Sequence, residues 1–441
     1  MPGAGDAGWV TGGLTGLRFP AHPRALIDGG AAFLTDAMRA WGVLSDGAEV
    51  IAIGAPEEWA GGSTGRKLSL SVTYAPATTT LPDQLFVKFS RDFDDPVRDH
   101  GRTQMAAEVQ FAALARAVQL PVTVPRTLFA DHHEGSDTAI LITERIPFGD
   151  NGIEHHHPKC LDDELPDAVG HYRALLAAVA RLAGADQAGR LPAGRTARFP
   201  VDLATASVGE PPRVTPERTQ RQVRRYVDFA RARPALLPEN IRTSRFVRRL
   251  ADEAPRVARH EADIWRFLSA RPQLIALCHW NANVDNAWFW RGADGALECG
   301  LLDWGCAGRL NLAMALWGAL SGARTELWDR HFDELLTGFA DEYHRAGGPR
   351  VDPRELTDHV VLYVAVMGVT WLLGSPAFLD GRLPAVVQGA QAPAVRDDEP
   401  VRTQLQMLTN VLNIWQTRDV AGTLDRCLHQ ATPPETPITP G

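Results

Sequence analysis

The hydrophobic periodicity changes along the chain, and this change limits most strongly the folds that the chain can adopt. Up to about residue 146, short runs such as 67–74 and 85–89 carry the alternating or largely apolar pattern of β-strands. Beyond that point, apolar residues recur at helical spacing in longer segments such as 171–182 and 215–231. The sequence therefore predicts an α+β protein with a small strand-rich part followed by a large, mostly helical part.

This change of periodicity sets the domain boundaries that we predict. They are an N-terminal extension and helix over residues 1–47, a strand-rich lobe over 48–146, a helical lobe over 147–431 and a disordered Pro- and Thr-rich tail over 432–441.

Three details within this division are open to test. Asp28 is the expected N-cap of the first helix. A helix over 244–268 is expected to kink or split at Pro255. The apolar stretch 360–373 is too short to span a bilayer, so we predict a buried helix there.

Charge and cysteine content narrow the class of protein. The formal net charge is −8 and the sequence pI is about 6.0, so no broad basic surface for nucleic acid is expected. The five cysteines are scattered and lack the spacing of a metal site, which favours free thiols in a reducing compartment. No basic start followed by an apolar core is visible at the N-terminus. We expect a cytoplasmic protein with no nucleic-acid or membrane partner.

Three features of the strand-rich part are typical of kinases when they occur in this order. A Gly-rich turn that contains Gly62, Ser63 and Gly65 lies between two predicted strands. Lys88 follows on the third strand, and Glu108 lies on the next predicted helix. Kinases use such a strand lysine and helix glutamate to hold the phosphates of ATP. Taken singly, the same features also fit a plain hairpin, a lysine that extends to solvent and an exposed helix carboxylate.

Two features of the helical part continue this order. The loop from His279 to Asn286 contains Asn281 and Asp285. Asp303 comes directly after an apolar run, where a carboxylate is costly to bury without a cation or several hydrogen bonds. In kinases a catalytic loop that ends in a metal-binding Asn is followed by a metal-binding Asp.

In these motifs the chain resembles the aminoglycoside phosphotransferase and choline kinase-like family. The catalytic loop of that family reads H-G-D-x-x-x-x-N. Here His279 and Asn286 match, whereas Trp280 replaces the Gly and Asn281 replaces the catalytic Asp. The family's metal motif, an apolar pair followed by D-W or D-F, is matched by the run that contains Asp303. The resemblance covers roughly residues 48–350 and implies a two-lobed protein-kinase-like fold.

The resemblance also implies roles for individual residues and a small-molecule substrate. Lys88 would bind ATP phosphates with Glu108 orienting it, and Asn286 and Asp303 would hold Mg²⁺, so that Lys88, Asn286 and Asp303 converge on one cleft. The hinge beside the adenine would include Glu144 and Ile146.

The replacement by Asn281 leaves three functions open. An amide can orient a hydroxyl but cannot accept a proton near pH 7. The protein is then a phosphotransferase with an altered catalytic base, a nucleotide-binding pseudokinase, or a kinase fold reused for non-kinase biosynthetic chemistry. Asp285, four residues on, is an alternative base or a loop-capping carboxylate.

Two other groups of residues have weaker functional interpretations. Trp280 could cover the acceptor site. Acidic side chains on later predicted helices could recognise a cationic substrate or could form an ordinary acidic surface; these are Glu334, Asp341 and Glu342.

Overall fold

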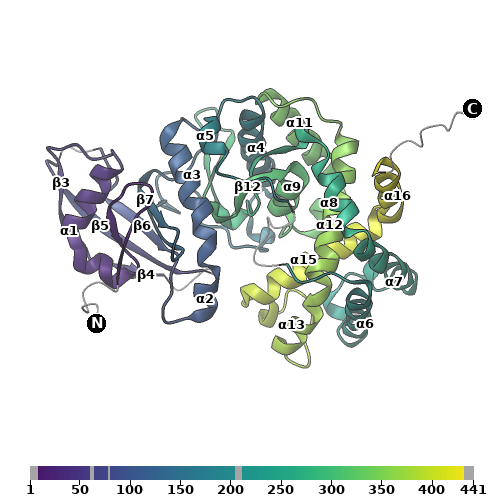
Figure 1. Cartoon of the computed structure of the whole chain (residues 1–441). Helices are drawn as coiled ribbons and strands as arrows, with labels where there is room; N and C mark the ends of the chain where they lie inside the picture. Colours follow the sequence, from purple (N-terminus) through teal and green to yellow (C-terminus); the bar gives the residue numbers. More distant parts are fainter. Residues whose placement is uncertain (1–7, 60–63, 78–79, 204–210, 432–441) are drawn as a thin grey trace, which may run out of the picture. The chain divides into compact units, whose positions relative to one another are not determined.

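The protein is described by a computed structural model that covers residues 8–59, 64–77, 80–203 and 211–431. Its contacts divide the chain into two compact units. The first comprises residues 1–155 together with 191–199 and 300–307, and the second comprises the remaining segments. A sheet dominates the first unit and helices dominate the second, which confirms the predicted α+β class (Figure 1).

The first unit is built on an antiparallel sheet. Its strand order is β3-β5-β6-β8-β7, with the short β4 paired to β5. The strands are β3 (Glu49–Ile53), β4 (Glu57–Glu58), β5 (Arg66–Ala75), β6 (Gln84–Phe89), β7 (Thr127–His133) and β8 (Thr138–Glu144). The sequence analysis missed β7.

Helices on the sheet complete the core of the first unit. Helix α1 (Pro23–Ala40) contacts β3 and β7, and α3 (Met105–Ala117) contacts β7 and β8 (Figure 1). The N-cap of α1 is His22, whose side chain accepts a hydrogen bond from the backbone N–H of Ala25, so the prediction of Asp28 as N-cap is wrong. Proline at the first helical position favours this earlier start. The shorter helices are α2 (Pro96–His100) and α5 (Ala193–Thr196).

A hairpin of β1 (Trp9–Thr11) and β2 (Arg18–Pro20) precedes α1 and was not predicted. The backbone N–H groups of Leu14 and Thr15 in its turn donate to the carboxylate of Asp131 at 2.9 and 3.0 Å. Asp131 lies on β7 and is fully buried, so these bonds attach the hairpin to the sheet.

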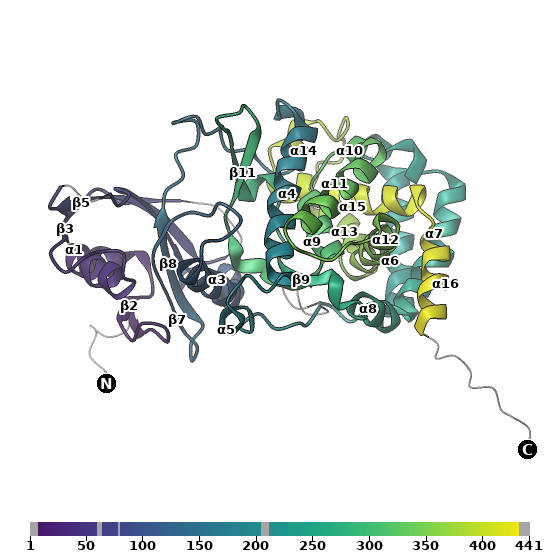
Figure 2. The same cartoon turned by 90° about the horizontal axis from the view of Figure 1, so that it is seen from above.

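The second unit is a group of helices around α12 (Pro353–Thr370), which contacts α7, α8, α9, α15 and α16 (Figure 2). Two strand pairs, β9 with β12 and β10 with β11, lie outside the large sheet. Their bounds are β9 (Ile275–His279), β10 (Ala287–Arg291), β11 (Leu297–Leu301) and β12 (Ala307–Asn311). The other helices are α4 (Ala168–Gln187), α6 (Pro216–Ala232), α7 (Ser244–Arg259), α8 (Glu261–Ser269), α9 (Leu312–Leu320), α10 (Thr325–Arg330), α11 (Phe332–Arg345), α13 (Ser375–Arg382), α14 (Pro393–Arg396), α15 (Glu399–Thr417) and α16 (Val420–Ala431).

Two of the detailed predictions have clear outcomes in this unit. Pro255 lies inside α7, and the break comes at His260, so the predicted position of the break is wrong. The stretch 360–373 is buried and mostly helical, as predicted. By length and composition alone, Pro353–Arg382 could cross a membrane, but 83% of its apolar window is buried inside the protein, as in a core helix. All five cysteines are free thiols.

Candidate functional site

An ion-paired lysine is the centre of the candidate site in the first unit. The ammonium Nζ of Lys88 on β6 lies 2.8 and 2.7 Å from the two carboxylate oxygens of Glu108 on α3. It also lies 2.7 Å from Oδ1 of Asp303. The Glu108 side chain is 4% exposed and that of Asp303 is 39% exposed. The structure therefore brings together three residues that are up to 215 positions apart in sequence.

Local structure explains why these three side chains meet. Leu85, Val87 and Phe89 alternate into the core on β6, so Lys88 points to the other face of the sheet. Asp303 lies just after β11 with a left-handed backbone (φ 63°), and Trp304 follows it in the first unit.

Trp304 anchors the segment that carries Asp303. Its ring stacks on Phe111 of α3 at 3.6 Å between centroids, with 8° between the ring planes. The backbone N–H of Leu301 donates to Thr123 at 2.9 Å. Glu108 and Phe111 lie on the same helix, so one element positions both carboxylates around Lys88.

Electrostatics favour the charged form of Lys88, whereas burial opposes the charged form of Glu108. Burial alone would lower the pKa of Lys88, but Asp303 and Glu108 outweigh it and raise the pKa. Burial raises the pKa of Glu108 against the attraction of Lys88. Because both Glu108 oxygens accept hydrogen bonds from Lys88, we infer that Glu108 is ionised at neutral pH.

A second lysine stands beside the first, and sequence reasoning did not single it out. Lys67 on β5 is the register partner of Lys88, so both side chains lie on one face of the sheet. Burial and the charge of Lys88 lower the pKa of Lys67, whereas Asp303 and Glu108 raise it. The chain has only three lysines among 45 lysine and arginine residues, and this scarcity was a signal that could have identified Lys67.

The end of the Gly-rich turn is fixed by the segment after β6. Gly65 has φ 53°, and a Cβ there would lie 1.8 Å from the carbonyl oxygen of Phe89, so only glycine fits. The guanidinium of Arg98 donates to the Gly65 carbonyl at 2.6 and 3.0 Å. Gly62 and Ser63, predicted to bind nucleotide, lie outside the described residues.

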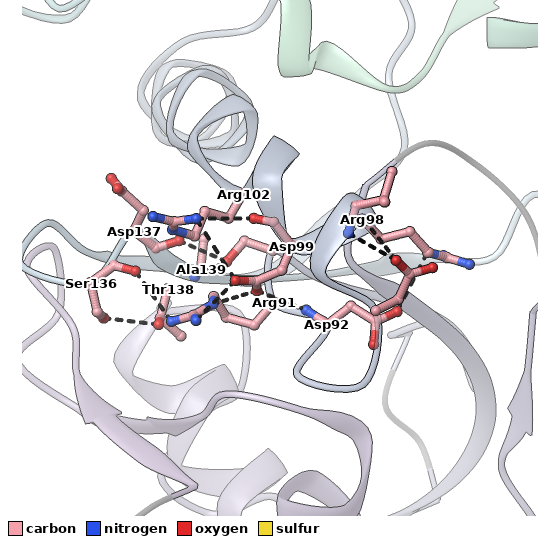
Figure 3. Close-up of polar contacts among 12 residues, drawn as sticks. Arg91, Asp92, Arg98, Asp99, Arg102, Ser136, Asp137, Thr138 and Ala139 are labelled. Atoms are coloured by element: carbon pink, nitrogen blue, oxygen red, sulfur yellow. Dashed lines mark hydrogen bonds and ion pairs between the residues drawn. The ribbon is translucent and has the colours of Figure 1, made fainter. Parts of the chain in front are cut away.

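Further ion pairs hold this segment in place. Arg91 donates to both carboxylate oxygens of Asp99, which lowers the pKa of Asp99, and Arg98 lies 3.5 Å from Asp92 (Figure 3). Beside the segment after β6 lies a cavity of about 340 Å³. Its lining includes Trp59, Arg66, Lys67, Arg98 and four acidic side chains. Gly65 and Lys67 thus lie beside a network of ion pairs.

The predicted hinge residues have structural partners of their own. The Glu144 carboxylate accepts a hydrogen bond from the backbone N–H of Arg126 at 2.7 Å, which supports the pairing of β7 with β8. The carbonyl of Ile146 accepts from Phe148 at 3.0 Å. Arg145 lies over the Trp59 ring at 5.2 Å.

The catalytic-like loop belongs to the second unit and begins at the end of β9. Nδ1 of the buried His279 accepts the backbone N–H of Asn281 at 3.1 Å. The side-chain oxygen of Asn281 accepts from Asn283 at 2.8 Å, and its backbone carbonyl accepts from Nδ2 of Asn286 at 2.9 Å. The amides of Asn283 and Asn286 therefore satisfy polar groups of the loop itself.

Asp285 does not join this network within the described residues. Burial raises the pKa of its carboxyl, while the charge of Lys159 lowers it. Its backbone carbonyl contacts His156 at 3.0 Å. Trp280 is held by a hydrogen bond of 2.6 Å from its indole N–H to the hydroxyl of Tyr363 on α12.

The oxygen donors suit a magnesium ion. Mg²⁺ prefers carboxylate and carbonyl oxygens together with nucleotide phosphates. Asp303 supplies a half-exposed carboxylate in the first unit. In the second unit, Asn286 uses its amide nitrogen for the loop, which leaves the amide oxygen as the atom suited to a metal.

Comparison with known proteins yields structural likeness only. No family model and no curated protein matches the chain. Among solved structures it is similar to a microcompartment-associated aminopropanol kinase, with 13% identity, a TM-score of 0.42, and coverage of 86% of this chain and 95% of the kinase. The chain resembles aminoglycoside phosphotransferases and choline kinases.

Two more structures illustrate that resemblance. A choline kinase from Cryptosporidium parvum has 10% identity and a TM-score of 0.41, with 90% of this chain and 95% of the kinase covered. A spectinomycin phosphotransferase has 12% identity and a TM-score of 0.40, with 87% of this chain and 97% of the other covered. Because these scores are low, we base the function on the contacts of Lys88.

Proposed function

We propose that the protein is an ATP-dependent phosphotransferase that acts on a hydroxyl group of a small molecule. The contact of Lys88 with both Glu108 and Asp303 carries this proposal. A strand lysine held by a helix carboxylate, next to a second carboxylate suited to a metal, is the arrangement with which kinases position ATP.

The charged residues around Lys88 each have a role in this proposal. Lys88 binds the nucleotide phosphates, Glu108 fixes its ammonium group, and Lys67 adds a second cation on the same face. Asp303 in the first unit carries a carboxylate, and Asn286 in the second unit an amide oxygen, of the kind that would hold Mg²⁺; the ion would supply positive charge to the phosphates.

The amide of Asn281 replaces a general base. Its N–H or oxygen can orient the acceptor hydroxyl, but it takes no proton near pH 7. A general base contributes typically about 10²–10⁴-fold, whereas phosphoryl transfer depends mainly on positioning and electrostatics. Slow transfer without a base is therefore compatible with this loop.

Calorimetry with Mg-ATP tests the nucleotide site. We expect Lys88→Met and Asp303→Asn to weaken binding at least about tenfold, since each removes a charge facing the phosphates or the metal. Asp46→Asn, at an exposed position, is the matched control. Equal affinity in wild type and Asp303→Asn would refute the metal role, and no binding at all would favour non-kinase chemistry.

A nucleotide-binding pseudokinase is the second candidate, and Asn281 is the observation that favours it. Transfer of the γ-phosphate to a panel of metabolites separates the two. Turnover by wild type that Asn281→Asp abolishes shows that the amide itself is used. Activity that appears only in Asn281→Asp identifies a pseudokinase.

A further inference from the structure

A polar cavity lies beside the catalytic-like loop in the second unit. Its volume is about 170 Å³, and one face of α15 and the start of α10 form much of its wall. The polar side chains that line it include Cys160, Arg324, Thr325, Arg396, Arg402 and Gln406.

Gly322 lies close to both a wall residue of the cavity and a residue of the loop. Gly322 lies between the two, because a Cβ there would be 3.1 Å from Sγ of Cys160 and 3.4 Å from Oδ1 of Asn283. Asn283 in turn donates to Asn281. Gly322 and Asn283 thus lie between the cavity wall and Asn281, and among the described residues the lining of the cavity contains none of the loop itself.

A hydrogen-bond chain supports the same boundary. The hydroxyl of Ser321 donates to Asn283 at 3.4 Å, and Nδ2 of Asn410 donates to the carbonyl of Ser321 at 2.9 Å. The side-chain oxygen of Asn410 accepts from Thr325 and Gln406, both at 3.1 Å. Those two residues line the cavity.

Arg402 gives the cavity its chemical preference. Its side chain is 10% exposed, yet its hydrogen bonds go to the neutral carbonyls of Lys159 at 2.8 Å and Arg396 at 3.1 Å. The carboxylate paired with it, Glu399, lies 3.6 Å away and is itself 64% exposed. A buried guanidinium whose ion pair is this long, and reaches an exposed carboxylate, retains an attraction for an anionic ligand.

The other two arginines of the cavity wall differ in how nearby carboxylates neutralise their charge. Arg396 donates to Asp163 at 2.8 Å and to Glu164 at 2.6 Å, so its charge is neutralised. Arg324 lies 3.6 Å from Glu326, and both side chains are about half-exposed. Arg324 is therefore the second cation that can turn toward an anion.

We propose that this cavity is the acceptor site and that it takes a small hydroxylated metabolite whose carboxylate binds Arg402 and Arg324. A planar carboxylate matches the paired donors of a guanidinium. The acceptor hydroxyl faces the side of the cavity where Asn283 and Asn281 lie.

Two of the acidic helix residues that would attract a cationic substrate are already paired. Glu334 lies 2.6 Å from Arg173, and Glu342 contacts Arg345 and Arg181. These pairs partly neutralise two of the three acidic residues singled out on α11, and the exposed Asp341 is the third. The acceptor role rests on the proposed phosphotransferase function, but anion binding by the cavity does not.

Ligand-observed NMR titration with three matched probes tests the proposal. Glycerate, glycerol and 3-amino-1,2-propanediol share two hydroxyls and differ in one group: a carboxylate, a hydroxymethyl or an aminomethyl. We expect glycerate to bind at least about tenfold more tightly than the other two, since only it pairs with the guanidinium groups. Arg402→Gln should remove that preference.

Controls separate this proposal from the nucleotide site. Arg402→Gln should bind Mg-ATP like wild type, and Arg382→Gln, an exposed pair with Asp398 outside the cavity lining, should keep glycerate binding. Should Arg402→Gln fail to fold, the half-exposed Arg324→Gln replaces it, and unchanged glycerate affinity there overturns the proposal. Equal binding of all probes, preference for the amine, or no binding at tens of millimolar also overturns it.

Discussion

At the scale of single residues, the placement of lysine is the most informative feature. The protein has three lysines, and arginine supplies its other basic side chains. Two of the three, Lys67 and Lys88, are register partners on adjacent strands. An ammonium group is a compact point charge that suits a phosphate oxygen, whereas the larger guanidinium suits planar, bidentate partners. Lysine thus occurs where the proposed phosphates would lie.

Replacing Lys67 should change the free energy of unfolding and the affinity for Mg-ATP in opposite directions. Burial and the charge of Lys88 lower the pKa of Lys67, so the folded protein disfavours its charged form. We expect Lys67→Met to raise the free energy of unfolding by roughly 0.5–1 kcal/mol. The same variant should weaken Mg-ATP binding about tenfold, because a cation facing the phosphates is lost.

Urea denaturation and calorimetry on the same preparations check both effects. Lys159→Met, which changes the third lysine in the other unit, should leave nucleotide affinity unchanged. Loss of stability in Lys67→Met together with unchanged nucleotide affinity would contradict the assignment of Lys67 as a phosphate ligand.

At the scale of elements, the strand that follows the Gly-rich turn depends on one glycine. A methyl group at Gly65 would meet the Phe89 carbonyl at 1.8 Å in addition to the strain of φ 53°. We expect Gly65→Ala to cost about 1–3 kcal/mol in the free energy of unfolding from the backbone conformation alone, and more from the clash.

Gly295→Ala is the matched control for that variant. Gly295 also has a positive φ, 80°, but open space around its Cβ position, so it reports the backbone strain without a clash. Equal destabilisation of the two variants, measured by urea unfolding, would mean that the contact with Phe89 does not restrict Gly65.

A buried carboxyl joins three elements of the helical unit and makes stability depend on pH. Burial raises the pKa of Asp162 to about 6, although hydrogen bonds from Tyr172 on α4 and from the backbone N–H of Arg324 oppose that rise. The folded state therefore holds a proton more tightly than the unfolded state, whose pKa is 3.8. The contribution of protonated Asp162 to the free energy of unfolding is therefore complete below pH 3.8 and is lost as the pH rises through 6.

Comparison with Asp162→Asn isolates this effect. As pH rises from 5 to 7.5, we expect the free energy of unfolding of wild type to fall by about 1.4 kcal/mol relative to the variant. His359, whose pKa burial lowers to about 4, is common to both proteins and cancels. A constant difference across this pH range would show that Asp162 is ionised throughout.

At the scale of the whole molecule, the first unit is discontinuous in sequence. Residues 191–199 and 300–307 belong to it although they lie within the sequence of the second unit. We expect a fragment of residues 1–155 to unfold without the cooperativity of the full chain, because it lacks Trp304, which stacks on Phe111. Urea titration followed by tryptophan fluorescence measures this.

A full-length variant tests the same contact without truncation. Trp304 is 4% exposed, so Trp304→Ala should cost about 3–5 kcal/mol. A sharp, wild-type-like transition in the fragment would contradict the view that the returning segments are needed.

The sequence by itself determined the type of most elements. Periodicity is a local property, and it identified the strands that carry Lys67 and Lys88. The lack of Gly and Pro and the richness in Ala, Glu and Gln identified the helix that carries Glu108. Motif order singled out Lys88, Glu108 and Asp303 before their contacts were known. It missed the β1–β2 hairpin because strands of three residues are too short to show a period.

Only the tertiary structure decided which residues meet. Strand register placed Lys67 beside Lys88, the return of residues 300–307 brought Asp303 to Lys88, and helix packing set Arg402 in a cavity near the catalytic-like loop. Such contacts join residues far apart in sequence. They depend on how buried surfaces fit together, which no local spacing along the chain encodes.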